Sequence, residues 1–379
     1  MKIVHVCVAG YQPILSPDGG AVQRRILELS RVQARNGHDV TAFSAGRSND
    51  EMRVDGVSVR IIRCVTRMPW RHAEYLARLL LALMRGPRPD VLNFHGQPEG
   101  VVIAKVLRRP AVLFYDYFYY RGGRYALLYR FYRRLLLSFD LLLPCSEYCL
   151  AGSLDYWKLD SRKPVVQYNG VNLAQFRPDR DAGSAERTRL KIDGPVVLYV
   201  GRVNSQKGTD VLLEGFTLLK QRMDDVSLVV AGPISQFGEQ RDLEAARVWT
   251  RRIQAAGGRY VGPVDEDRLA AVYNIADVFV MPTRTLEMFG MAAVEAQACG
   301  VPVVASDHGG LRETVPEECG GRFPPGDAAA LAVKLRELLE DVDQRKRCAD
   351  AAIANAARYS WDRVVSDLDA QYARIGIRG

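Results

Sequence analysis

Short apolar runs alternate with amphipathic segments along nearly the whole sequence, and this alternation limits the possible folds more than any other feature. Runs such as residues 40–43 and 196–200 are too short for helices, whereas residues 22–36 carry apolar side chains at helical spacing. Strands that alternate with helices of about 10–15 residues predict right-handed βαβ units and a mostly parallel sheet. We expect strands at residues 3–7, 40–43, 57–62, 91–94, 112–115, 141–143, 165–167, 196–200, 227–231, 259–261, 278–281 and 301–305, and helices at residues 22–36, 73–85, 125–137, 147–157, 209–222, 241–256, 266–275, 291–299 and 328–340.

The alternation is interrupted once. Residues 177–187 show no apolar periodicity, and we interpret them as a linker. A chain of 379 residues is also long enough for two domains with separate cores. We therefore predict an α/β protein with two Rossmann-like, doubly wound parallel-sheet domains, at residues 1–180 and 181–359. An amphipathic helix at residues 360–379 is expected to dock back on the first domain.

Positive charge is concentrated in the first half of the chain. Residues 1–180 contain 27 Lys and Arg against 15 Asp and Glu, whereas the remaining residues contain 25 against 29. The first half would therefore favour an anionic partner or surface. Nothing in the sequence resembles a module that reads bases, so nucleic acid is not an expected partner.

Cysteines and apolar runs indicate the cellular location. Seven scattered Cys in a long chain are typical of reduced, cytosolic thiols, and they do not complete the four-ligand cluster of a zinc site. The longest apolar run in a helical stretch, residues 79–84, is far shorter than the roughly 20 residues of a membrane span. The N-terminus lacks the features of a signal peptide. We expect a cytoplasmic protein, with peripheral contact at the inner face of the membrane as an open alternative.

Two glycine-containing turns follow predicted strands. Gly19 and Gly20 precede the first helix, where backbone N–H groups can approach an anion, although an ordinary turn is the alternative. Gly201, Arg202 and Lys207 follow the first strand of the second domain. Because ligands of open α/β sheets bind beyond the carboxyl ends of strands, we expect Arg202 and Lys207 to converge on a diphosphate rather than to remain solvated.

A third loop carries two carboxylates at a fixed spacing. Glu287 lies just before a helix that Gly290 opens, and Glu295 lies inside that helix. The N–H groups at Met291 and the following residue are free to bind anionic oxygens. The two carboxylates can therefore face different parts of one elongated polar ligand. Small neighbours around Glu295 argue against a position on the surface.

The segment E-M-F-G-M-A-A-V-E at residues 287–295 resembles the signature of glycosyltransferase family 4. These are retaining, nucleotide-sugar-dependent enzymes of the group 1 transferases, related to glycogen synthases and mannosyltransferases. Their GT-B fold implies two Rossmann-like domains that face a central cleft. Other family motifs occur in the expected order: G-H-D-V at 37–40, P-D-V-L-N-F-H at 89–95, N-G-V-N at 169–172, F-R-P at 176–178, G-R…K-G at 201–208, A-D-V-F-V-M-P at 276–282 and G-G-L-R-E at 309–313.

The resemblance implies transfer of a sugar from a nucleotide-diphosphate sugar, with a UDP-sugar as the expected donor. The acceptor would be a hydroxyl of a small molecule, a glycan or a lipid-linked compound, bound by the N-terminal domain. By position, Arg202 and Lys207 would hold the donor diphosphate, Glu287 the sugar hydroxyls and Glu295 the ribose. Further contacts to the donor would come from Gly19, Gly20 and Gly201 and from the backbone of Phe289, Gly290 and Met291.

The expected site requires no metal. The negative charge of the leaving nucleoside diphosphate grows as the glycosidic bond breaks, and Arg202, Lys207 and a helix N-terminus would meet it there. Asp-x-Asp pairs occur at residues 265–267, 341–343 and 367–369, but none of these follows a predicted strand. We expect no cofactor besides the donor itself.

The sequence departs from the family at the predicted acceptor side. Many members carry His-Asp where this chain has Tyr115 and Asp116. A phenol is a poor base near neutral pH, so Asp116 becomes the candidate that orients the acceptor. Tyr115 and His95 are further candidates for acceptor contacts, although a packed, hydrogen-bonded histidine is the alternative for His95.

Residues 114–134 are dense in aromatic side chains, with arginines interleaved. Aromatic rings stack on sugars, which fits an acceptor pocket. The same mixture suits an anionic membrane surface or lipid carrier. A helix that packs on the sheet and exposes its arginines is equally compatible, so three interpretations stay open.

The fold alone does not determine the reaction. A sugar-nucleotide epimerase or hydrolase shares the GT-B fold, and it would act on the donor without an acceptor. A catalytically inert partner protein that binds a sugar nucleotide is the non-enzymatic alternative, because Tyr115 replaces a residue of the family pattern.

Overall fold

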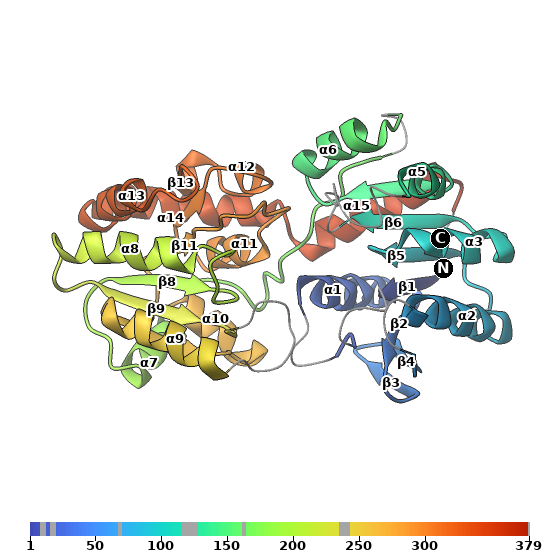
Figure 1. Cartoon of the computed structure of the whole chain (residues 1–379), viewed down its shortest axis with the longest axis horizontal. Helices are drawn as coiled ribbons and strands as arrows, with labels where there is room; N and C mark the ends of the chain where they lie inside the picture. Colours follow the sequence, from blue (N-terminus) through green and yellow to red (C-terminus); the bar gives the residue numbers. More distant parts are fainter. Residues whose placement is uncertain are drawn as a thin grey trace. The chain divides into compact units, whose positions relative to one another are not determined.

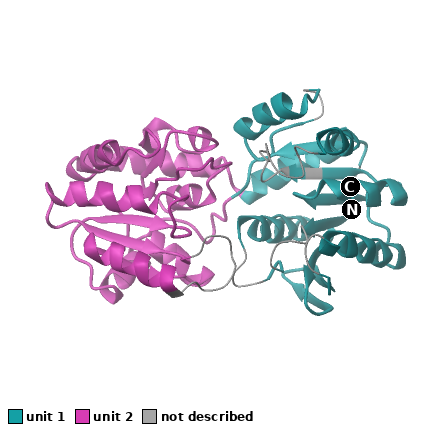
Figure 2. Ribbon diagram, viewed as in Figure 1, with its two compact units in different colours: residues 1–170, 361–379 teal, residues 171–360 magenta. Residues whose placement is uncertain are grey.

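The computed structural model describes residues 1–7, 13–15, 20–66, 70–115, 128–160, 164–234 and 243–377, apart from the side chains at 113, 115 and 243. The chain divides into two compact units (Figure 2). The first unit is Met1–Gly170 with Trp361–Gly379, and the second is Val171–Ser360. Each unit holds one largely parallel sheet with helices packed on it (Figure 1), so the predicted α/β architecture of two parallel-sheet domains is confirmed.

The first unit is built on a seven-stranded sheet in the order β3-β4-β2-β1-β5-β6-β7. Neighbouring strands run parallel except β3 and β4, which form an antiparallel hairpin. The hairpin turns at Asp55 and Gly56, both with positive φ, as a tight two-residue turn requires. The strands are β1 (Lys2–Cys7), β2 (Asp39–Gly46), β3 (Asp50–Val54), β4 (Val57–Arg63), β5 (Val91–His95), β6 (Ala111–Tyr115) and β7 (Leu141–Pro144).

Helices of the first unit bury apolar stripes on this sheet. Leu79, Ile103 and Leu136, from three different helices, share one core with Val6 and Phe94 of the central strands. The terminal helix contacts the first helix of the chain. The helices are α1 (Ala21–Arg35), α2 (Trp70–Arg85), α3 (Val101–Leu107), α5 (Tyr129–Leu137), α6 (Glu147–Trp157) and α15 (Trp361–Arg374), with a 3-10 turn, η1 (Pro98–Gly100).

The second unit has a six-stranded, fully parallel sheet in the order β10-β9-β8-β11-β12-β13. Its central strands are almost entirely apolar because helices cover both faces of such a sheet. The strands are β8 (Val196–Val200), β9 (Ser227–Ala231), β10 (Gly258–Gly262), β11 (Val278–Met281), β12 (Val303–Ser306) and β13 (Gly320–Phe323). The helices are α7 (Arg180–Arg189), α8 (Thr209–Lys220), α9 (Leu243–Ala255), α10 (Glu266–Tyr273), α11 (Met291–Ala298), α12 (Leu311–Thr314), α13 (Ala328–Glu340) and α14 (Val342–Ala357), with η2 (Glu317–Cys319).

The predicted linker at residues 177–187 is wrong, because helix α7 occupies most of it. The side chain of Asp179 caps the helix by accepting a hydrogen bond from its first turn. Glu186 is buried and accepts hydrogen bonds from Arg189 and, on α10, from Arg268. Ion pairs rather than an apolar stripe hold α7 in place, so apolar periodicity could not reveal it.

The boundary predicted after residue 180 also lies too late. The chain passes from the first to the second unit at Gly170–Val171 and returns at Ser360–Trp361. Residues 171–180 belong to the second unit because their side chains pack there. The Phe176 ring, for example, meets the Tyr273 ring edge-on at 5.8 Å between centroids.

Several smaller elements differ from the prediction. Residues 165–167 are not assigned to a strand. An isolated bridge joins Leu142 to Pro164, and the backbone N–H groups of Val165 and Gln167 donate to β7. The hairpin strand β3 was not predicted because most of its side chains are exposed and polar. The short elements α3, α12 and β13 and the helix α14 were also missed. Helix α5 begins at Tyr129, and residues 125–127 of its predicted range lie outside the described part of the chain.

No helix in the described ranges is both long enough and apolar enough to cross a bilayer.

Candidate functional site

The sheet of the second unit has a topological switch point between β8 and β11. Chain order runs outward from β8 to β10 on one side and from β11 to β13 on the other. The loops after these two strands, residues 201–208 and 282–290, therefore leave the carboxyl edge of the sheet side by side. Open α/β sheets bind ligands at this place. Six of the predicted site residues lie on these two loops, namely Gly201, Arg202, Lys207, Glu287, Phe289 and Gly290.

Lys207 and Glu287 form an ion pair across the switch point. The Lys207 Nζ donates a hydrogen bond to Glu287 Oε2 at 2.6 Å. Their side chains are 24% and 19% exposed, so the pair is shielded but still reaches solvent. The sequence marked both residues as ligand-binding, but it did not predict that they contact each other.

A glycine brings the two loops together. Gly208 has φ +72°, and a Cβ atom there would lie 1.7 Å from the carbonyl oxygen of Pro282. The carbonyl oxygen of Gln206 accepts hydrogen bonds from the backbone N–H groups of Arg284 and Thr285, at 3.0 and 3.2 Å. Lys207, between Gln206 and Gly208, is thereby held against the loop that carries Glu287.

The loop after β12 supports Glu287 from another direction. Gly310 N donates a hydrogen bond to the Glu287 carbonyl oxygen at 2.8 Å. Gly309 has φ +63°, and a Cβ atom there would lie 2.4 Å from the same oxygen. The absence of a side chain at Gly309 and Gly310 therefore leaves room for the Glu287 backbone, to which Gly310 is hydrogen-bonded.

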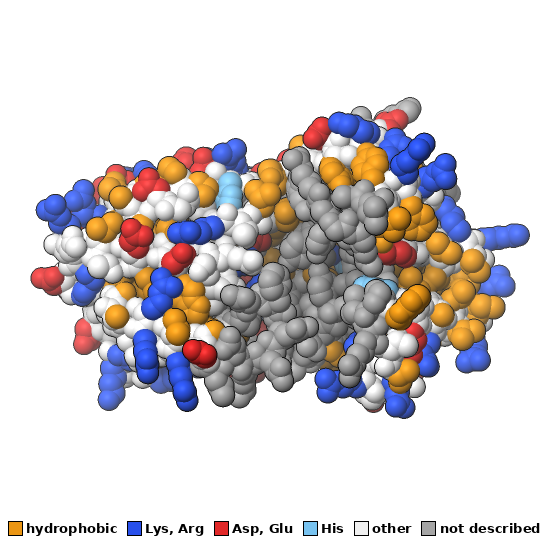
Figure 3. Space-filling view, in the orientation of Figure 1, with side chains coloured by type: hydrophobic (Ala, Val, Ile, Leu, Met, Phe, Trp, Pro, Cys, Tyr) orange, Lys and Arg blue, Asp and Glu red, His pale blue; other side chains and the backbone are white. Residues whose placement is uncertain are grey.

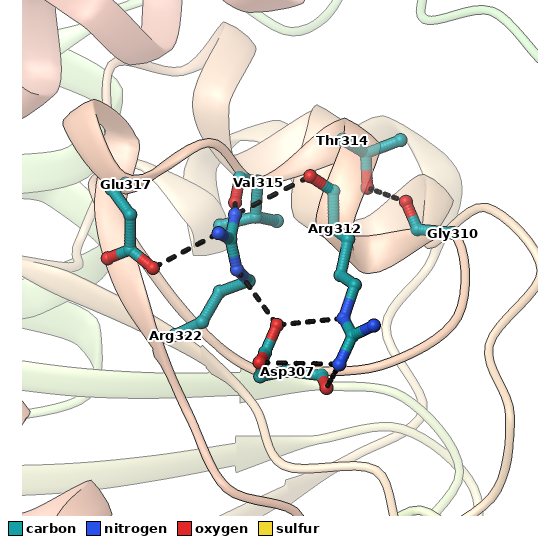
Figure 4. Close-up of polar contacts among 7 residues, drawn as sticks. All are labelled: Asp307, Gly310, Arg312, Thr314, Val315, Glu317 and Arg322. Atoms are coloured by element: carbon teal, nitrogen blue, oxygen red, sulfur yellow. Dashed lines mark hydrogen bonds and ion pairs between the residues drawn. The ribbon is translucent and has the colours of Figure 1, made fainter. Parts of the chain in front are cut away.

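A charged cluster fixes that bracing loop (Figure 4). Asp307 accepts hydrogen bonds from Arg312 at 3.0 Å and from Arg322 at 3.1 Å. Arg322 also pairs with Glu317 at 3.2 Å and donates to the Val315 carbonyl oxygen at 2.7 Å. Figure 4 shows both guanidinium groups directed at Asp307, which ties α12 to β13.

The N-terminus of α11 begins directly after the Glu287 loop. Gly290 is its N-cap with φ +89°, and the first turn closes with a hydrogen bond from Ala293 N to Gly290 O at 3.0 Å. The N–H of Met291 precedes this bond and points out of the helix end, where the helix dipole favours negative charge. Phe289 is buried against the Tyr359 ring. Donor contacts by the backbone at Phe289, Gly290 and Met291 remain a prediction.

Glu295 takes part in a separate contact inside the unit. It is 3% exposed, and its Oε2 accepts a hydrogen bond from the Tyr273 hydroxyl at 2.8 Å. The pKa of the Cys299 thiol is raised to about 12, mainly by burial and further by the charge of Glu295. Glu295 is therefore not a surface residue, and its predicted contact with a ribose stays a prediction.

Gly201 and Arg202 open the loop after β8. A Cβ atom at Gly232 would lie 2.1 Å from the Gly201 carbonyl oxygen, so glycine is needed where the loops after β8 and β9 meet. The Tyr199 hydroxyl donates to the Arg202 carbonyl oxygen at 2.6 Å. Burial raises the pKa of Tyr199, whereas the nearby charge of Arg202 lowers it. Arg202 is half-buried, and it lies at the carboxyl edge of the sheet, as the Lys207–Glu287 pair does.

The first unit has its own switch point, between β1 and β5. A fully buried chain of hydrogen bonds lies there. Arg25 Nη2 is 2.9 Å from His95 Nδ1, His95 Nε2 is 2.9 Å from His5 Nδ1, and His5 Nε2 is 2.7 Å from Gln33 Oε1. Arg25 also donates to Asn169 at 3.3 Å. We call Arg25, His95, His5 and Gln33 the histidine relay.

The relay has one consistent direction. Arginine can only donate, so His95 Nδ1 accepts, and the proton on His95 Nε2 is donated to His5 Nδ1. His5 Nε2 then donates to Gln33. Burial lowers the pKa of His5 to about 4 and that of His95 well below its ordinary value, and the charge of Arg25 adds to both shifts. Both rings are therefore neutral at pH 7.

His95 uses both ring nitrogens within the relay and stacks on Phe114 at 4.6 Å between centroids. This is the packed geometry that the sequence left open as an alternative, and contact with an acceptor remains a prediction. Gly20 is the N-cap of α1 and donates its N–H to Gln23 at 3.0 Å. Gly19, Asp116 and the side chain of Tyr115 lie outside the described residues.

Metal ligands do not gather among the described side chains. Across these ranges, no group of three or more His, Cys, Asp or Glu side chains is placed to hold an ion. The independence from metal remains a prediction. The predicted Asp-x-Asp pairs fall at helices, for example Asp265 at the N-cap of α10 and Asp341 at that of α14.

Sequence reasoning missed several residues around the two switch points. Tyr273 and Tyr199 lie in apolar stretches of sequence that are typical of a core. Their hydroxyls nevertheless donate hydrogen bonds to Glu295 and to the backbone of Arg202. His5 and Arg25 sit in a strand and a helix without any motif. Burial lowers the pKa of His308, and the charge of Glu287 acts on it in the opposite direction. The G-G-L-R-E motif directly after His308 was the only signal near it.

Comparison with known proteins gives matches over both units. Residues 184–355 match the family model described as glycosyl transferases group 1, and residues 19–175 match that described as glycosyltransferase family 4. A D-inositol 3-phosphate glycosyltransferase of Salinispora tropica is 39% identical over 235 residues, which cover 58% of this chain and 48% of that protein. One of Jonesia denitrificans is 35% identical over 224 residues, covering 57% and 52%. The match spans about half the length of these curated relatives.

Solved structures share the fold over nearly the whole chain. A sucrose-phosphate synthase from Thermosynechococcus elongatus aligns with a TM-score of 0.80 at 22% identity, covering 99% of each chain. Anabaena HepE in complex with UDP and glucose aligns with a TM-score of 0.77 at 19% identity, covering 98% of this chain and 99% of that chain. The predicted GT-B fold class is confirmed.

Proposed function

Since this chain belongs to the glycosyltransferases of group 1 and family 4, we propose that it transfers a sugar from a nucleotide-diphosphate sugar to a hydroxyl group with retention of configuration. The Lys207–Glu287 ion pair at the switch point of the second unit carries this proposal. It places a cation and a carboxylate at the position where open α/β sheets bind ligands.

Each partner of the ion pair has a role in the proposed reaction. Lys207 would exchange the Glu287 carboxylate for a diphosphate oxygen, because a phosphate carries more negative charge. Glu287, released from Lys207, would accept hydrogen bonds from the hydroxyls of the donor sugar. Arg202 and the N-terminus of α11 would add further positive potential along the same edge.

Bond changes in the proposed reaction balance without a cofactor. The bond between the anomeric carbon and the diphosphate oxygen breaks, and the nucleoside diphosphate leaves with the electron pair. The acceptor oxygen forms its bond to the same carbon from the same face. Its proton passes to an oxygen of the leaving phosphate. Lys207 and Arg202 stabilise the charge that grows on the leaving group, so no metal is needed for that purpose.

The names of relatives guide the choice of substrates to test. Curated relatives are D-inositol 3-phosphate glycosyltransferases, and HepE has been solved with UDP. We therefore propose a UDP-sugar as donor and inositol 3-phosphate as the first acceptor to examine, with glycan and lipid-linked acceptors as the next. Asp116, Tyr115 and His95 remain the proposed acceptor contacts. We propose a cytoplasmic location.

Substitution of Lys207 tests the proposal. K207A should lower the rate of transfer by about 10²–10³-fold, the effect of removing one group that stabilises transition-state charge. The matched control is K334A, which removes a lysine from the exposed Lys334–Glu337 pair of the same unit. Release of UDP from UDP-sugars is measured with and without acceptor, and circular dichroism checks the fold. Equal rates for K207A and the wild type would contradict the proposal.

The same assay separates the alternatives. A transferase releases UDP rapidly only with an acceptor, whereas an epimerase or hydrolase consumes the donor alone. An inert binding protein would show thermal stabilisation by the donor through mass action but no release of UDP with any acceptor.

A further inference from the structure

Helix α2 of the first unit is apolar on two opposite sides. Its inner side buries Tyr75, Leu79 and Leu83 in the core, with exposed fractions of at most 4%. Its outer side presents Trp70, which is 73% exposed, together with the residues named below. A surface helix normally needs only one apolar stripe. Because the inner stripe already fills the core, folding of the unit does not explain the outer one.

The outer stripe of α2 continues onto neighbouring helices. At 100° per residue, Trp70, Leu81 and Met84 fall on one line of the helix. Helix α3 contacts α2, and α5 packs on the same core. In Figure 3 an apolar area occupies the right of the view, where Figure 1 shows α2 and α3. We define the outer apolar face as Trp70, Leu81, Met84, Val102, Val106 and Phe131, which are 49–73% exposed.

Cations border the outer apolar face. Arg85 ends α2, Lys105 lies beside Val106 on α3, and Arg130 and Arg134 lie on α5, all of them exposed. Figure 3 shows blue side chains around the apolar area. The first half of the sequence also carries the net positive charge of the chain. A partner with negative charge and an apolar interior would complement such a surface.

We propose that the outer apolar face docks on an anionic lipid bilayer. Trp, Leu, Met and Phe enter the boundary between headgroups and acyl chains, and Arg and Lys around them bind anionic headgroups. Charge favours a bilayer over a second copy of this chain. A two-fold contact would place the same cations opposite one another, which opposes association. This surface does not involve the Lys207–Glu287 site, so its test is independent of the proposed function.

Vesicle sedimentation tests the docking surface. The wild-type chain should bind phosphatidylglycerol vesicles at low salt, bind phosphatidylcholine vesicles weakly, and lose binding as salt screens the headgroup charge. Two variants separate the apolar and the charged contributions to binding. L81S/M84S replaces apolar side chains of the face, and R85E/R134E reverses positive charges at its border. Each should weaken binding at least about tenfold, since each cation near an anionic surface contributes on the order of 1 kcal/mol.

A matched variant on the second unit serves as control. Val248 and Arg251 are exposed neighbours on α9, so V248S/R251E makes the same kind of change elsewhere and should bind like the wild type. Melting by circular dichroism confirms that each variant is folded. Absence of binding to anionic vesicles at low salt would overturn the proposal. Equal binding by all variants would overturn it too, as would a wild-type dimer that L81S/M84S converts to monomers.

Discussion

The two sheets reverse their strand order at comparable places but fill those places with different chemistry. At the β8–β11 switch point, Lys207 and Glu287 form a charged pair that reaches solvent. At the β1–β5 switch point, His5 and His95 form a neutral, fully buried relay with Arg25. A pair that keeps contact with solvent can exchange its partner for a ligand. A buried chain of fixed direction instead holds backbone and side chains in one arrangement.

Removal of His95 should reveal the stabilising role of the relay. H95L removes the two ring nitrogens that pair with the Arg25 guanidinium and with His5 Nδ1. Because both groups stay buried without that partner, the free energy of unfolding should fall by about 4 kcal/mol. Hydrogen exchange of β1 and β5 peptides measures this locally. The control F114L trims the ring stacked on His95 and should cost only about 1 kcal/mol. Similar losses for the two variants would show that packing, not the relay, stabilises this place.

Acid should weaken the first unit selectively. Unfolded His5 takes up a proton near its ordinary pKa of 6.5, whereas the folded ring does so at about 4. Between these values the unfolded state binds more protons, so the free energy of unfolding falls as the pH drops from about 6.5 to about 4. The loss from His5 alone is on the order of 3 kcal/mol, and His95 has the same sign.

Unit-resolved hydrogen exchange, corrected for intrinsic rates, measures this dependence. Peptides of β1 and β5 should lose protection across that range, and peptides of β8 and β11 should lose less. His308 in the second unit has a pKa lowered in the same direction, but it is only half-buried. Equal losses of protection in the two units would show that the histidine relay does not make the first unit more sensitive to acid.

Close approach of the loops in the second unit can be tested at Gly208. G208A places a Cβ against the Pro282 carbonyl oxygen and strains a positive φ, and it should lower the free energy of unfolding by about 2–3 kcal/mol. Gly257 has φ +78° and open space within 4 Å of where a Cβ atom would lie, so G257A isolates the cost of the backbone, about 1 kcal/mol. If the two variants were equally stable, contact between the loops would not constrain Gly208.

Periodicity predicted the parts of the fold that depend on burial. Apolar strands such as β8 and β11 and amphipathic helices such as α1 and α13 were found because each buries one side or both. Elements that polar contacts hold escaped detection. Helix α7 is tied by Glu186 to arginines, and β3 is exposed, so neither has an apolar pattern.

Candidate site residues show the same division. Lys207, Glu287 and the glycines around them were marked by motifs, because their types and spacing are visible in one stretch of sequence. Tyr273 lies 22 residues from Glu295, and His5 lies 90 residues from His95. A motif cannot show such pairs, since only the folded sheet brings these positions within hydrogen-bond distance.

By itself, the sequence determined that two α/β sheets form and which loops at their edges carry cations, carboxylates and glycines. Burial imposes a regular spacing on apolar residues, and close approach of two backbones requires glycine. Both signals can be read within a short stretch of sequence. Tertiary structure decided which of these groups meet. The pairing of Lys207 with Glu287, the direction of the histidine relay and the outward apolar side of α2 depend on contacts and exposure that arise only when distant segments pack.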